Sequence, residues 1–224
     1  MDEISTGRVK ISGLFYGNET TTAYLMKTHI SPLSTRKGFT LVELLVVIAI
    51  IAILATMAVA GARIAKDAAA NAGARAAIAD LTNALDAFYD DQDAFPLSEG
   101  QDEDSEVTTD SQLMNILTGI DTDENPQGNS YFTFKKAKGN NNNYWDGLYR
   151  TASTAELYGP WKNRNKNDRF YRVIFNYDYD EFIREPSSTG GSEEIYGYKY
   201  LIYHAGKDGE VGGEENVDNL YNWK

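Results

Sequence analysis

The chain has 224 residues, a formal net charge of −12 and no cysteine, so disulfides, thiolate catalysis and cysteine-ligated metal sites are excluded. An acidic chain repels phosphate, which argues against a nucleic-acid ligand and favours divalent cations or basic partners. His29 and His204 are the two histidines, which argues against a His-rich metal site or a His-based triad. With no phosphate-binding glycine loop or HExxH pattern either, we expect a protein that is not an enzyme.

An apolar run is the first element along the chain. Residues 44–60 carry no charge, and with residues 39–43 they form a stretch of about 22 residues, or about 33 Å of helix. That length crosses a hydrocarbon core of about 30 Å. Arg36 and Lys37 precede the run, so the positive-inside rule predicts a single span with a cytoplasmic N-terminus and an exported acidic remainder. A secretory signal peptide or a plain anchor is the alternative.

Glu43 is a carboxylate within this run, flanked by Val42 and Leu44. At membrane depth an ionised side chain costs several kcal/mol unless it has a partner. If the chain were cut after Gly38, Phe39 would carry a new α-ammonium. Glu43 lies four residues further on the same helical face, so it could neutralise the amine of its own or a neighbouring subunit.

Residues 37–48, KGFTLVELLVVI, closely resemble the prepilin cleavage and methylation motif of type IV pilins and type II secretion pseudopilins. The resemblance covers about 25 contiguous residues. It implies cleavage by prepilin peptidase between Gly38 and Phe39, N-methylation of Phe39, and use of Glu43 to register subunits during filament assembly.

The leader implied by this motif is residues 1–38, which is longer than the short basic leaders of the family. A start at Met26 would give a thirteen-residue leader, MKTHISPLSTRKG. We therefore expect that Met26 is the true start and that residues 1–25 are not part of the protein.

The helix is expected to continue beyond the apolar run, from about Phe39 to Asp90. Residues 61–91 are rich in alanine, and their larger apolar residues recur at separations of three, four and three, which places one stripe on a helix face. The stripe consists of Ile78, Leu81, Leu85 and Phe88. A coiled coil is the alternative, but the heptad pattern is too short to support it.

Residues 92–224 are expected to form an exported globular domain. Residues 98–110 resemble a surface loop and Ser111–Leu117 a short helix. Gly139 to Asn143, followed by Asn163, Asn165 and Asn167, indicates a polar insertion without regular structure. Phe170–Tyr179 and Ile195–Tyr203 alternate aromatic and β-branched residues and are predicted as strands joined by a loop. A long helix packed on a small antiparallel sheet is an α+β fold of the pilin-like kind.

The acidic tail, residues 204–223, is the second informative region. Its carboxylates, amides and glycines offer the oxygen ligands that calcium prefers, although an EF-hand does not fit and a solvated acidic loop is the plain alternative. The segment resembles the C-terminal calcium loop of the major pseudopilin family, protein G of type II secretion. The resemblance implies carboxylate ligands at Asp208 and Asp218, with backbone carbonyls near Ala205 and Val211. Asn219 stands where that family often has a second Asp.

A looser resemblance concerns Gly159-Pro160-Trp161, where the same family usually has Asp-Pro-Trp-Gly. Gly159 therefore replaces an aspartate of the family pattern.

These features together predict a pseudopilin of the bacterial inner membrane: a structural subunit of a periplasmic pseudopilus in type II protein secretion. Its expected partners are other pseudopilins, prepilin peptidase and the inner-membrane platform of the secretion system, with calcium as a structural ion. Two alternatives stay open. One is a type IV pilus subunit for adhesion, motility or DNA uptake, and the other is a periplasmic binding module that uses a pilin-type anchor.

Overall fold

The computed structural model describes residues 38–98, 105–186, 193–210 and 219–223, together with the backbone of two short strands that precede them. The chain forms two compact units, Met1–Ala55 and Thr56–Lys224. The boundary between the units falls within the long helix α1 (Leu41–Gln92).

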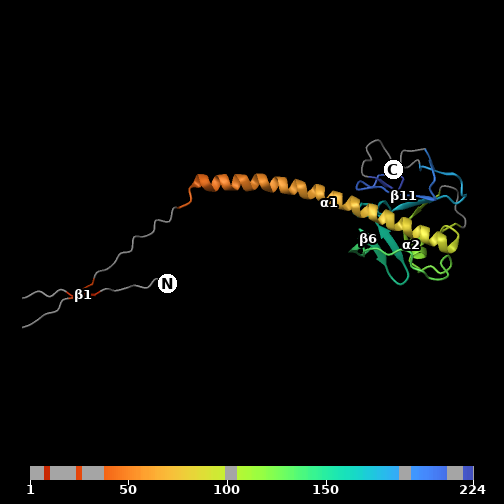
Figure 1. The fold of residues 1–224 in the computed structure, drawn as a ribbon, viewed down its shortest axis with the longest axis horizontal. Coiled ribbons are helices and arrows are strands. Elements are labelled where there is room, and N and C mark those ends of the chain that lie inside the picture. Colours follow the sequence, from red (N-terminus) through yellow and green to blue (C-terminus); the bar gives the residue numbers. More distant parts are fainter. Residues whose placement is uncertain are drawn as a thin grey trace, which may run out of the picture. The chain divides into compact units, whose positions relative to one another are not determined.

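The first unit contains an antiparallel pair of strands and the beginning of helix α1 (Figure 1). Strand β1 (Arg8–Lys10) pairs with β2 (Tyr24–Met26), both within the segment predicted as a leader. The other residues up to position 37 lie outside the described part of the chain. A start at Met26 stays a prediction.

Helix α1 has nearly the predicted bounds. Its sequence is free of proline and rich in alanine and leucine, which are strong helix formers. After Gln92 the chain turns at Asp93, whose φ of 54° is left-handed, and the Asp93 amide donates to the Tyr89 carbonyl at 2.8 Å. Pro96 follows shortly and cannot continue the helix.

In the second unit, α1 buries the predicted stripe. Ile78, Leu81, Leu85 and Phe88 are all at most 5% exposed, and Ala74, Ala77 and Ala84 complete the buried face. Small residues between the larger ones let the sheet approach the helix backbone, and the Tyr200 hydroxyl donates to the Thr82 carbonyl at 2.9 Å. The apolar periodicity of residues 61–91 is thus confirmed as a core-facing stripe.

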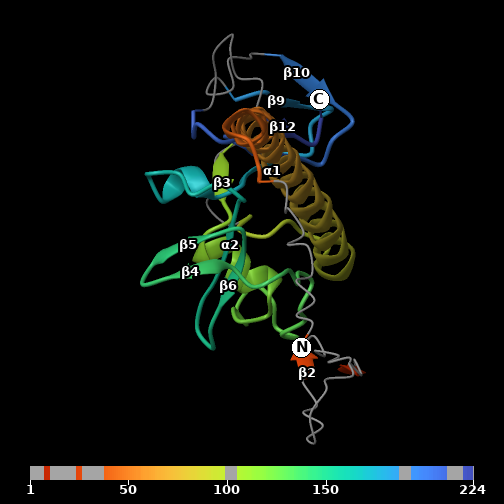
Figure 2. The ribbon, with the colours of Figure 1, turned by 90° about the vertical axis from the view of Figure 1, so that its left-hand side faces the viewer.

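The main sheet has the strand order β12-β11-β8-β3, and its neighbouring strands are antiparallel (Figures 1 and 2). One face, with Val173, Phe175 and Ile202, joins the core under α1, and the opposite face packs Ile174 and Leu201 against Ile183. The α+β prediction is therefore correct. The strands are β3 (Glu106–Thr108), β8 (Arg172–Phe175), β11 (Tyr200–His204) and β12 (Leu220–Tyr221).

Three antiparallel strand pairs and two short helices surround this sheet. The pairs are β4 (Lys138–Asn140) with β5 (Asn143–Trp145), β6 (Gly147–Arg150) with β7 (Ala155–Tyr158), and β9 (Phe182–Arg184) with β10 (Glu194–Tyr196). Helix α2 (Ser111–Leu117) begins and ends as predicted, and a 3-10 turn covers Asn167–Arg169.

Some local predictions were wrong. The strand predicted for Ile195–Tyr203 is divided into β10 and β11 because Gly197 between them has a φ of 79°, which a strand does not accommodate. The strand predicted for Phe170–Tyr179 is regular only over Arg172–Phe175. The loop predicted for residues 98–110 contains β3, whose Val107 is buried opposite Val173.

The asparagine-rich insertion also has regular structure. β4 and β5 form a hairpin whose two turn residues, Asn141 and Asn142, have left-handed φ values of 49° and 62°. Asparagine tolerates this conformation better than most residues, so a composition that resembles an irregular loop instead closes a tight hairpin.

Candidate functional site

The start of α1 contains the predicted cleavage and assembly residues. Gly38 and Phe39 are exposed, Phe39 to 78%, and both precede the helix. A Cβ placed on Gly38 would have no atom within 4 Å, so no described residue packs on this position. The predicted cleavage and methylation positions are thus next to each other in an accessible segment.

Glu43 is bound to Thr40 by a reciprocal set of hydrogen bonds. The backbone and hydroxyl of Thr40 donate to Glu43 Oε2 at 2.8 and 2.9 Å, and the Glu43 amide donates to the Thr40 hydroxyl oxygen at 3.2 Å. This Thr-x-x-Glu arrangement is a capping box, which satisfies amide groups at a helix start. The pattern is visible in the sequence, although Phe39 was the only partner expected for the carboxylate.

Large apolar side chains remain exposed along the first part of α1, between Phe39 and Ile64. Leu41, Val42 and Met57 are 86%, 70% and 67% exposed. By length and composition α1 can cross a membrane: its apolar window has a mean hydropathy of 2.9 and no residue of that window is buried. Such exposure is unfavourable in water and favourable in hydrocarbon.

Residues 33–59 match the family model of the prokaryotic N-terminal methylation motif. The match covers the residues at which the sequence resembles prepilins, and the structure adds a long apolar helix followed by small antiparallel sheets. Together they indicate a type IV pilin-like protein that prepilin peptidase processes, with an N-terminal helix consistent with a single-pass membrane anchor. No curated protein and no solved structure matches the chain.

The C-terminal turn begins where β11 ends. Gly206 and Gly209 have φ values of 71° and 78°, so the backbone reverses within residues 205–210. Asp208 is exposed, and its Oδ1 accepts from the Glu210 amide at 3.0 Å. Of the other predicted calcium ligands, Asp218 and Val211 lie outside the described residues.

Asn219 lies against this turn and is 8% exposed. One terminal atom of its amide faces the carbonyl oxygens of Ala205 and Glu210 at 3.0 and 3.2 Å, and the other faces the Tyr221 hydroxyl at 3.1 Å. With nitrogen toward the carbonyls, the amide bonds to both of them. In this orientation the amide oxygen accepts from the Tyr221 hydroxyl, so all three contacts are satisfied without a cation.

The Asn219 amide therefore closes the turn by hydrogen bonds. A calcium ion bound to the Ala205 and Glu210 carbonyls would have to displace the amide nitrogen from them. Among the residues that the structure describes, no three carboxylate, histidine or cysteine side chains come together to hold a metal. The structure thus brings Asn219 to the Ala205 carbonyl, as the resemblance implied, and also to the Glu210 carbonyl, which the sequence did not predict.

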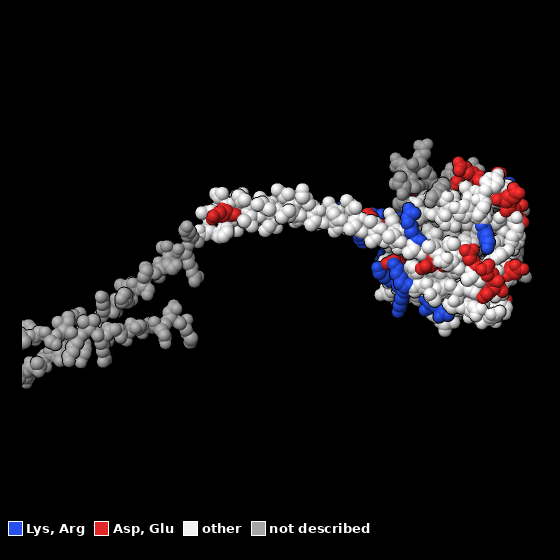
Figure 3. Space-filling view, in the orientation of Figure 1, with Lys and Arg blue, Asp and Glu red and all other residues white. Residues whose placement is uncertain are grey.

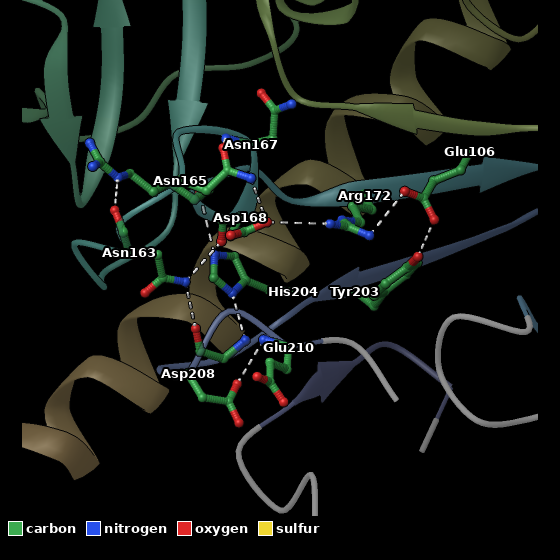
Figure 4. A network of polar contacts seen from close by, with 12 residues as sticks. Glu106, Asn163, Asn165, Asn167, Asp168, Arg172, Tyr203, His204, Asp208 and Glu210 are labelled. Atoms are coloured by element: carbon green, nitrogen blue, oxygen red, sulfur yellow. Dashed lines mark hydrogen bonds and ion pairs between the residues drawn. The ribbon is translucent and has the colours of Figure 1, made fainter. Parts of the chain in front are cut away.

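A buried polar network packs against the C-terminal turn (Figure 4). The Gly206 amide donates to His204 Nδ1 at 2.9 Å, and Asn163 Nδ2 donates to the carbonyls of Gly206 and Asp168 at 3.2 and 3.0 Å. Arg169 Nε donates to the Asn163 carbonyl at 2.6 Å. Because Nδ1 accepts a hydrogen bond, the His204 proton belongs on Nε2, which faces the Arg169 carbonyl at 3.3 Å.

His204 is fully buried, with its ring beside Trp161 and Tyr171. Burial, with a smaller contribution from the Asp146 charge, raises the pKa of the Tyr171 phenol, so this ring neighbour stays neutral. A Cβ on Gly159 would lie 2.0 Å from His204 Nε2. The glycine that departs from the family's aspartate is therefore required by the histidine beside it.

Proposed function

We propose that this protein is a pseudopilin, a non-enzymatic subunit of a periplasmic pseudopilus in type II protein secretion. Prepilin peptidase cuts after Gly38, Phe39 becomes the methylated N-terminus, and the apolar helices bundle in the inner membrane with the globular domain, residues 92–224, in the periplasm. The observation that carries the proposal is the beginning of α1, where the matched motif surrounds a carboxylate at the start of an exposed apolar helix.

The capping box allows a sharp test of Glu43. Glu43→Gln keeps a side chain that can close the box but removes the charge, whereas Thr40→Ala removes the box and keeps the charge. If the carboxylate pairs with the Phe39 amine of a neighbouring subunit, Glu43→Gln blocks filament assembly and Thr40→Ala does not. Membrane insertion, measured by fractionation, and leader cleavage, measured by mass spectrometry, should be normal in both variants and serve as controls.

The opposite pattern would restrict Glu43 to helix capping. Normal filaments with Glu43→Gln, together with weakened ones for Thr40→Ala, would contradict the assembly role. Surface fibres rather than short periplasmic filaments in electron micrographs of wild-type cells would favour the pilus subunit instead.

We also propose that the C-terminal turn binds calcium through Asp208, Asp218, Asn219 and the carbonyls of Ala205 and Glu210. A bound ion would cross-link the end of β11 to the segment before β12 and hold the turn closed. The resemblance of the tail to a calcium loop and the exposed Asp208 carboxylate in the turn support this proposal.

Chelator should lower the melting temperature of the calcium-loaded protein. At a calcium concentration about 100 times the Kd, binding contributes about 2.7 kcal/mol, or about 5–10 °C for a chain of this size. Asp208→Asn should reduce this shift, whereas Asn219→Asp should enlarge it because it adds a carboxylate. Asp90→Asn, at an exposed position on α1, is the matched control. An equal melting temperature with calcium and with chelator would contradict the proposal.

A further inference from the structure

A groove of about 340 Å³ lies beside the end of α1. Its lining includes the rings of Tyr89, Phe95, Tyr179 and Tyr198 and the acidic residues Asp180 and Glu181. Tyr179 stacks on Phe95 with ring centres 5.7 Å apart, yet 59% of its surface is exposed. The groove thus presents open aromatic surface next to carboxylates.

Such a surface suits a lysine side chain. An ammonium is attracted by the face of an aromatic ring and by carboxylates, while the lysine stem packs on the apolar parts of the rings. The groove already shows this chemistry within the chain, because Lys199 Nζ lies 4.6 Å from the centre of the Tyr89 ring.

The β4–β5 hairpin is a basic and polar projection of the same unit. Residues 138–143 are exposed, and Lys135, Lys136 and Lys138 lie at the base of the hairpin. Lys135 and Lys138 bind Asp146 at 2.5 and 2.7 Å. Burial alone would raise the pKa of Asp146, but the hydrogen bonds from both lysines outweigh it and hold that pKa below its ordinary value.

Asp146 therefore stays ionised and fixes the hairpin base. Lys136 is exposed and has no ion pair among the residues that the structure describes. Asparagine amides at the hairpin tip add hydrogen-bond donors that suit carboxylate acceptors. The hairpin therefore offers a cation and amide donors that complement the exposed rings and carboxylates of the groove.

The two surfaces lie at different ends of the second unit. Figure 2 shows β4, β5 and β6 at one end with α2, and β9, β10 and β12 at the other. On the face shown in Figure 3, basic side chains gather mainly on the side of β6 and acidic ones mainly on the side where α1 ends. The hairpin of one copy is therefore too far from its own groove to occupy it.

We propose that the β4–β5 hairpin of one copy docks in the aromatic groove of the next, with Lys136 directed to the carboxylates of Asp180 and Glu181. Because the two surfaces differ, the contact is head-to-tail and can repeat along an open filament. The inference rests on the proposed filament, to which it adds a contact between the periplasmic parts of neighbouring subunits.

Charge exchange in the full-length protein tests the contact. Lys136→Glu or Glu181→Lys alone should reduce assembly about tenfold, the effect of roughly 1.4 kcal/mol, and the two together should restore it. Arg164→Glu, a reversal of an exposed charge outside the hairpin, should leave assembly unchanged. The contact would be overturned if the control variant lost as much assembly as the single variants and the double variant recovered none.

Cross-linking gives a second measurement, in a chain that has no cysteine of its own. We expect a short bis-maleimide to join an Asn140→Cys copy to a differently tagged Glu181→Cys copy in membranes. A Ser153→Cys copy, also exposed, should not react with Glu181→Cys. No product above that control would overturn the docking.

A pair of anchor variants separates this result from the proposed function. Copies with Val46→Cys should form cross-linked products if the apolar helices bundle. Anchor products without hairpin products would leave the filament standing and remove the docking. Hairpin products without anchor products would support the docking and contradict the bundled filament.

Discussion

At the scale of single residues, Glu43 has a local role that does not depend on the proposed assembly contact. Its bonds with Thr40 close the start of α1, and a helix cap of this kind contributes about 0.5–2 kcal/mol. In hydrocarbon the same bonds also reduce the cost of the charge, because an ionised oxygen with two donors is partly solvated by its own chain. The carboxylate therefore costs less in an apolar environment than it would without Thr40.

The contact between Gly159 and His204 leads to a second residue-scale prediction. Gly159→Ala places a methyl group where His204 Nε2 lies, 2.0 Å away, so either the ring or the strand must move. We expect a loss of about 1–3 kcal/mol in the free energy of unfolding, the usual cost of overpacking. Urea unfolding measures it, and Gly73→Ala, whose nearest neighbour is 3.8 Å away, is the control.

A double-mutant cycle identifies the cause of that loss. If the ring is responsible, Gly159→Ala should cost much less in a His204→Ala background than in the wild type. Equal costs in the two backgrounds would show that the strain lies elsewhere.

At the scale of elements, regular periodicity made α1, α2 and the middle of β8 predictable. The stripe of α1 faces one core over several turns, so its period is visible in the sequence. The short strands were not predictable, because pairing with distant segments decides them: β3 is a strand since Val107 meets Val173. The side chains of Ile195–Tyr203 alternate like those of one strand, but the positive φ of Gly197 divides the segment into two strands.

The candidate site was also only partly predictable. The motif at residues 37–48 is contiguous, so the sequence alone located Gly38, Phe39 and Glu43. The hydrogen-bond network beside the C-terminal turn joins Asn163, Arg169 and Gly206, which are far apart in the sequence and are brought together only by the fold. No local pattern could reveal it.

The β4–β5 hairpin gives an element-scale prediction. Asn142 has a φ of 62°, a conformation that costs most L-residues about 1–2 kcal/mol and glycine very little. Asn142→Ala should destabilise the hairpin by about 1 kcal/mol, and Asn142→Gly should be neutral or stabilising. Hydrogen exchange of the hairpin amides measures this, with Asn140→Ala as control. Identical effects of alanine and glycine would contradict the turn.

At the scale of the whole molecule, the chain divides its apolar surface between two environments. From Ala74 onward the apolar stripe of α1 faces a closed core, whereas the large apolar side chains between Phe39 and Ile64 are exposed. One helix thus carries a buried stripe in one part and uncovered apolar residues in the other. Lipid is the environment that suits the uncovered part.

Membrane insertion should follow this division. Ala52→Lys with Ala55→Lys puts two charges into the apolar run, at about 2.5–3.5 kcal/mol each, and should abolish stable insertion. Ala69→Lys with Ala72→Lys, at exposed positions further along α1, should leave it intact. Alkaline extraction of membranes distinguishes the two, and equal extraction of both variants would contradict the assignment of the span.

The close approach of Gly159 to His204 has a consequence for how this sequence can evolve. Neither position can change first without cost: a side chain at 159 meets the imidazole, and a smaller residue at 204 removes a bond to the Gly206 amide. Descendants of this chain should therefore keep glycine and histidine as a pair or exchange both. A relative with aspartate at the first position should carry a residue other than histidine at the second, and a set of diverged sequences would reveal that correlation.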